Sequence, residues 1–150
     1  MSGPALKHWD SHSSIHEATL GEAIELHELL RLCVDKQDLE KALEVAYITV
    51  EHWETRTLCH AEAEEEGLYL EIVEEQPEMK ETIIALTRDH SLMRYLVNEI
   101  KQILLARGDF NEILQRFDAI ILIDLIHNKD EGKLIRGELL SDGIKQEKTG

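Results

Sequence analysis

Residues 27–34, HELLRLCV, and residues 90–97, HSLMRYLV, are two copies of one short pattern that decides how this chain folds. Both copies begin with histidine, and apolar residues follow three and seven positions later, which is the spacing of one face of an α-helix. Each copy precedes a His-x-x-x-Glu motif, HAEAE at 60–64 and HNKDE at 127–131. The chain therefore carries the same arrangement of histidine and glutamate twice.

Helix start and stop signals divide the chain into four segments. Ser14 and Asp109 each open a capping box, and Asp38 suits the N-cap position of a helix. Pro77 fits a first helical position, and Gly108 fits the C′ position that ends a helix. Short links between long helices make successive helices antiparallel neighbours, which predicts an all-α, up-down-up-down four-helix bundle. The predicted parts are an N-terminal arm (1–13), helices at 15–35, 38–74, 77–107 and 109–140 within a bundle of 14–140, and a polar tail (141–150).

Composition excludes several classes of partner. The chain has 150 residues and a formal net charge of −15, so we expect neither nucleic acid nor an anionic membrane surface as a partner. Neither an apolar run long enough to cross a membrane nor a signal peptide is evident, which favours a cytoplasmic protein. The two cysteines, Cys33 and Cys59, lie in apolar helical patterns and are predicted to be buried thiols.

The repeated motifs predict a metal site. Residues four apart lie on one helix face, so each His-x-x-x-Glu points both side chains the same way. Imidazole and carboxylate without thiolate suit iron, manganese or zinc, and bridging carboxylates, here Glu64 and Glu131, suit a pair of ions. The predicted ligands are His27, His60, Glu64, His90, His127 and Glu131.

The order H…HxxxE…H…HxxxE, with HAEAEEEGLY at 60–69, resembles the hemerythrin-like (HHE cation-binding) domains over about residues 14–140. The resemblance implies a four-helix bundle with two iron ions, bridged by Glu64 and Glu131 and by an oxo or hydroxo group. Oxygen-carrying hemerythrins have an additional third-helix histidine where this chain has Leu86, and they divide five histidines three and two between the irons. Two histidines for each iron are instead similar to di-iron proteins that repair iron–sulfur clusters.

That resemblance implies a protein that binds or reacts with oxygen, peroxide or nitric oxide, in stress defence or iron-centre repair. An oxygen- or iron-sensing or storage module without catalysis is the alternative, and a structural zinc or manganese bundle is a third. The sequence leaves open whether the protein is an enzyme and whether it forms a homodimer.

Other polar residues are assigned lesser roles. His8, His12 and His16 follow one another at four-residue intervals, but the capping box at Ser14 predicts a mobile terminus there. Asp89 is adjacent to a ligand and could orient an imidazole on another helix. His52 is assigned to the surface or to a position that supports the ligands, and Asp130 to a supporting position or to an alternative ligand. Tyr69 is assigned to packing, and it becomes a ligand or a redox-active group if it lies near the metal ions.

Overall fold

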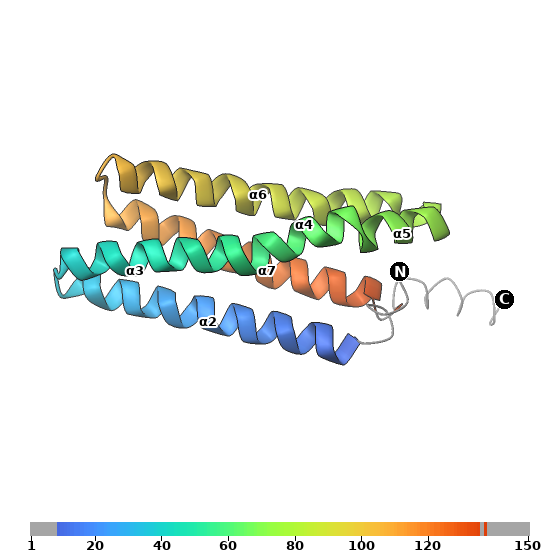
Figure 1. The fold of residues 1–150 in the computed structure, drawn as a ribbon, viewed down its shortest axis with the longest axis horizontal. Helices are drawn as coiled ribbons and strands as arrows, with labels where there is room; N and C mark the ends of the chain where they lie inside the picture. The colour runs from blue at the N-terminus through green and yellow to red at the C-terminus, as the bar shows by residue number, and fades with distance from the viewer. Residues whose placement is uncertain (1–8, 136, 138–150) are drawn as a thin grey trace.

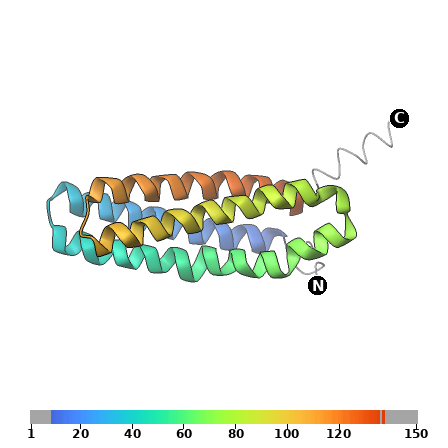
Figure 2. The same ribbon diagram turned by 90° about the horizontal axis from the view of Figure 1, so that it is seen from above.

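The chain forms long helices that lie side by side, as Figures 1 and 2 show. The computed structural model describes residues 9–135 and 137, and within them every regular element is helical. The all-α prediction is therefore confirmed for this part of the chain. In chain order the elements are α2 (Trp9–Asp35), α3 (Leu39–His52), η1 (Trp53–Leu58), α4 (Cys59–Glu66), α5 (Leu68–Glu75), η2 (Pro77–Met79), α6 (Lys80–Leu105) and α7 (Phe110–Ile135).

The elements pack as four long segments. α2 packs against α3 and α7, while α6 packs against α7 and against the segment that contains α3 and η1. None of the described helices combines the length and the apolar composition needed to cross a membrane. The bends between segments are short, and the structure shows how the sequence closes two of them.

Two aspartates start helices as predicted. Asp38 Oδ1 accepts a hydrogen bond from the Lys41 backbone N–H at 3.3 Å, and Asp109 Oδ1 accepts one from Asn111 at 2.9 Å. Each carboxylate satisfies a backbone donor that has no partner inside its helix. These contacts fix the beginnings of α3 and α7.

The helices before these aspartates end in the left-handed conformation, but not at a glycine. Arg107 has φ 54°, and the Gly108 N–H donates to the Ile103 carbonyl at 2.8 Å, so Arg107 and not Gly108 occupies the C′ position of α6. Gln37 takes the same role after α2, with φ 58°. Gly108 is needed for a different reason, because a Cβ there would lie 2.8 Å from Ile103 Cγ2.

Arg107→Gly is expected to raise the free energy of unfolding by about 1 kcal/mol, because glycine adopts positive φ without the steric cost that a side chain adds. Urea unfolding of the two proteins measures the difference. Gly108→Ala is the matched control at the neighbouring position, and it should lower stability. A stabilising Gly108→Ala, or a destabilising Arg107→Gly, would contradict this account of the turn.

Two of the predicted helices differ from the structure. α2 begins at Trp9 and runs through Ser14, so the predicted arm of residues 1–13 is helical at least from Trp9 onward. The helix predicted for 38–74 is interrupted by the π-helical η1 and again at Gly67. η2 leads directly into α6, in agreement with the helix predicted from Pro77. The predicted end near residue 140 and the tail 141–150 lie outside the described residues.

Apolar side chains form two separate clusters, with a polar layer between them. Along α7, Phe117 and Ile120 belong to the larger cluster and Leu134 to the smaller one, and the buried polar residues lie between these positions. Along α6, His90 separates Leu86 of the smaller cluster from Met93 of the larger. Burying ionisable groups is costly unless they are paired or bind an ion. The polar layer is therefore the candidate functional site.

Candidate metal centre

Seven histidine and glutamate side chains meet in the polar layer. They form two groups, and within each group one ligand atom per residue lies within 4.8 Å of the others. Glu64 belongs to both groups. The first group contains His12, His16, His60 and Glu64, and the second contains Glu64, His90, His127 and Glu131, so that α2, α4, α6 and α7 all contribute.

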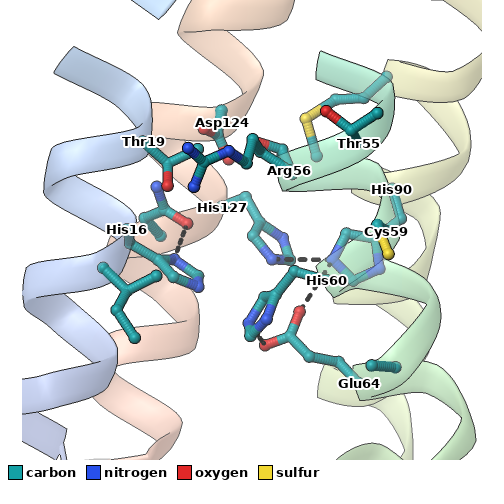
Figure 3. A pocket seen from close by; sticks show the side chains of 15 residues that line it. His16, Thr19, Thr55, Arg56, Cys59, His60, Glu64, His90, Asp124 and His127 are labelled. Carbon is teal, nitrogen blue, oxygen red and sulfur yellow. Dashed lines mark hydrogen bonds and ion pairs between the residues drawn. The ribbon is translucent and has the colours of Figure 1, made fainter. Parts of the chain in front are cut away.

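The second group is fully buried, and carboxylates orient its two imidazoles. His90 Nδ1 lies 2.7 Å from Glu65 Oε2, and His127 Nδ1 lies 3.0 Å from Asp89 Oδ2. An Nδ1–H that donates to a carboxylate leaves the Nε2 lone pair for another partner. The two Nε2 atoms face each other at 3.1 Å (Figure 3). Two lone pairs at this distance repel each other unless a proton or a cation lies between or beside them.

Glu131 connects the two groups. Its Oε1 lies 2.9 Å from His12 Nε2, and its Oε2 lies 3.2 Å from His127 Nε2. The Tyr69 hydroxyl donates a short hydrogen bond to the same Oε2. The Tyr69 ring also stacks on His90, with ring centroids 5.6 Å apart. Tyr69 thus lies close to the candidate ligands, which is the condition under which the sequence predicted a role for it.

The first group brings three imidazoles together at the edge of the bundle. The ring centroids lie 4.3 Å apart for His12 and His16, 4.9 Å for His16 and His60, and 5.3 Å for His12 and His60. His16 Nδ1 bonds to Asn128 Oδ1 at 2.7 Å. Three buried atoms of this group make no hydrogen bond to the described residues, namely His16 Nε2, His60 Nε2 and Glu64 Oε2, and the last two lie 3.4 Å apart. Unpaired buried polar atoms are costly, and these converge on one place, which is what a metal site requires.

Burial shifts the pKa of the ligand candidates away from their charged forms. It raises the pKa of Glu64 to about 11, with the negative charge of Glu131 adding to the effect. It lowers the pKa of His60 and of His90 to about 4, in each case helped by a neighbouring imidazole.

The partners of Glu131 and His127 outweigh burial. Burial alone would raise the pKa of Glu131, but hydrogen bonds from His12 and His127 hold it well below its usual range. Burial would lower the pKa of His127, but hydrogen bonds to Glu131 and Asp89 raise it. The cluster thus combines a strongly ionised carboxylate, Glu131, with the neutral imidazoles of His60 and His90, a donor set that a cation would stabilise.

His27 lies away from this cluster. Its Nε2 contacts Asp118 Oδ1 at 2.7 Å, and Arg31 bonds to the other oxygen of the same carboxylate at 3.2 Å. Asp118 precedes His127 by nine residues on α7, or roughly 14 Å along the axis. The structure thus brings together the other predicted ligands, namely His60, Glu64, His90, His127 and Glu131.

His12 and His16 take the place predicted for His27. The prediction of a mobile terminus is wrong at these two residues, because α2 already includes them and puts them one turn apart on one face. Their four-residue spacing was the signal that could have identified them. His8 lies outside the described residues.

Several other sequence assignments change. Cys33 is buried as predicted, but Cys59 is exposed. Asp89 does orient an imidazole, and Glu65, which is not among the predicted site residues, does the same. Asp124 is buried beside the cluster, and burial raises its pKa to about 6. His52 is half-buried against the Thr19 carbonyl, while Asp130 is exposed.

A cavity of about 320 Å³ adjoins the cluster, and Figure 3 shows it from close by. η1 supplies three consecutive lining residues, Thr55, Arg56 and Thr57. Three successive residues of a regular α-helix point in directions about 100° apart, so the wider π-helical turn helps to bring them to one cavity. The other lining residues are Ile15, His16, Thr19, Cys59, His60, Ala63, Glu64, His90, Met93, Asp124, His127 and Asn128.

No protein-family model, curated protein or solved structure matches this chain.

Proposed function

We propose that the cluster binds two metal ions. His12, His16 and His60 hold one ion, His90 and His127 hold the other, and Glu64 and Glu131 bridge them. The observation that carries this proposal is the facing pair of Nε2 atoms, 3.1 Å apart, in rings whose Nδ1 atoms are both engaged by carboxylates. A cation accommodates both lone pairs and the neighbouring carboxylates at once, whereas a proton satisfies only the one contact.

Iron is the metal we propose, with manganese or zinc as alternatives, because nitrogen and oxygen donors with bridging carboxylates suit a pair of iron ions. We also propose that the bundle is of the antiparallel, up-down-up-down, hemerythrin-like kind. The course of the colour along successive segments in Figure 1 supports this topology. With His12 and His16 both present, the histidines divide three and two, and not two and two as expected from the sequence alone.

The proposed activity is binding of, or reaction with, oxygen, peroxide or nitric oxide. When bound, a pair of iron ions supplies one-electron and two-electron redox chemistry at the cluster. Glu65 and Asp89 orient the imidazoles, and Tyr69 holds one bridging carboxylate through its hydroxyl. The adjoining cavity gives a small molecule access to the ligand atoms, which favours a reactive centre.

Reversible oxygen binding or sensing is the second candidate. The observation that favours it is the third imidazole in the first group, because each added protein ligand leaves one fewer exchangeable position on the ion. Stopped-flow mixing of the reduced, iron-loaded protein with oxygen separates the two functions. Rapid irreversible oxidation supports the reactive centre, and a stable adduct through repeated cycles supports binding.

Metal analysis with an optical spectrum of aerobically purified protein tests the site. We expect two iron ions per chain and near-ultraviolet charge-transfer absorption. The double variant His12→Ala/His16→Ala should retain about one ion, because it removes imidazoles from the first group only. His27→Gln is the matched control on the same helix and should retain both ions. Equal metal content in the double variant and the wild type would show that α2 contributes no ligand at this position.

A further inference from the structure

We propose that the cavity beside the metal centre binds a small organic carboxylate, whose anionic end pairs with Arg56 while its apolar body lies toward the metal ligands. This inference rests on the proposed metal centre and adds a second substrate or effector class to it.

The size of the cavity exceeds what a diatomic ligand needs. A volume of about 320 Å³ is at the lower end of the range found for small-molecule pockets, whereas one water molecule occupies roughly 30 Å³ of liquid. Its walls also match an amphiphilic molecule. Met93, Ile15 and Ala63 provide apolar surface, and hydroxyls of Thr19 and Thr55 lie among the lining residues with Arg56.

Arg56 is the cation of this cavity. Figure 3 shows its side chain extending from η1 across the cavity in the direction of Thr19 and Asp124. Within the described part of the chain, no carboxylate lies within 4.0 Å of its guanidinium, although Arg31, Arg94 and Arg116 each contact one. A guanidinium binds a carboxylate through two parallel hydrogen bonds, so a carboxylate ligand is its best-matched partner.

Charge makes this binding depend on the metal ions. Two divalent ions outweigh the two bridging carboxylates, and Arg56 adds a positive charge, so the loaded cavity is positive even if Asp124 is ionised. Without metal, the same cavity lacks the four positive charges of the two ions, and Arg56 is then the only arginine or lysine among the lining residues. The rest of the protein repels anions, since the chain carries a formal net charge of −15.

Calorimetric titration of the metal-loaded protein with benzoate tests the proposal, with benzamide as a neutral ligand of the same shape. Benzoate should bind at least about tenfold more tightly than benzamide, and Arg56→Gln should weaken benzoate binding by about tenfold or more. Arg88→Gln is the matched control, because Arg88 is an exposed arginine of α6 that does not line this cavity. It should leave benzoate affinity unchanged.

The test separates this inference from the metal centre itself. Metal content is measured first for every variant, and Arg56→Gln and Arg88→Gln should both keep two ions. A loaded protein that binds no benzoate, or binds it equally well without metal or without Arg56, overturns the carboxylate site and leaves the metal centre standing. Inorganic phosphate that binds as tightly, with the same dependence on Arg56, also overturns it, because the cavity would then select charge and not an organic acid.

Discussion

Replacing Glu64 with glutamine is expected to abolish binding at both metal positions and, in the metal-free protein, to raise the free energy of unfolding. Glu64 belongs to both ligand groups, so its loss affects both ions. Without metal, burial raises its pKa from 4.5 to about 11, so the folded state must hold a proton that the unfolded chain releases at neutral pH. Holding that proton lowers the free energy of unfolding by on the order of 3 kcal/mol at pH 7, and glutamine, which is neutral, removes this penalty.

The raised pKa of Glu64 also predicts how the stability difference between Glu64→Gln and the wild type changes with pH. A carboxyl group whose pKa is raised on folding contributes its full stability below the unfolded value of 4.5 and loses it as the pH rises. The stability advantage of Glu64→Gln should therefore be absent below pH 4.5 and grow toward pH 7. Urea unfolding of metal-free proteins at several pH values measures it. Glu66→Gln, an exposed position on α4, is the control and should show no such trend. A stability difference between Glu64→Gln and the wild type that does not depend on pH would contradict its explanation by the raised pKa of Glu64.

Removing the metal ions is expected to lower the melting temperature by roughly 20 °C. Ligands that bind only the folded state stabilise it by about 4 kcal/mol for each ion held at a thousand times its dissociation constant. For a chain of this size, each kcal/mol corresponds to about 2–4 °C. Calorimetry before and after treatment with a chelator, and again after metal is restored, measures the change.

Metal removal should also affect the two apolar clusters unequally. The larger cluster contains Trp53, Phe117 and Ile100 and has its own extensive packing, whereas the smaller one depends on the polar layer to join it to the rest of the bundle. Hydrogen exchange should therefore increase first near Leu134 and Ile72. An unchanged melting temperature after complete metal loss would mean that the polar layer is stable by itself.

Local signals in the sequence were sufficient for the helical class and for much of the site. Asp38 and Asp109 act on backbone groups two or three residues away, so their roles can be read from neighbouring residues. The spacing of His60 with Glu64 and of His127 with Glu131 is likewise local, since four residues make about one helical turn. These predictions needed no knowledge of which helices are neighbours.

The errors in the predicted ligand set involve the level at which one helix lies beside another. His27 and His90 occur in matching sequence, but His27 lies eight residues before the end of α2, and His90 lies fifteen residues before the end of α6. The two histidines therefore lie at different levels along the bundle although the sequences around them match. The first turns of α2 have partners in α7, as His12 contacts Glu131 and His16 contacts Asn128. A capping signal at Ser14 cannot report contacts with residues more than a hundred positions away.

The π-helical segment Trp53–Leu58 makes the site sensitive to the number of residues in the chain as well as to their identity. Deleting one residue from it would turn the following helix by about 100° about its axis. His60 and Glu64 would keep their mutual spacing but would point away from His90 and His127. A lineage could therefore gain or lose this centre through a single-codon insertion or deletion while every ligand remained in its sequence. Comparisons that count matching residues alone would not detect that event.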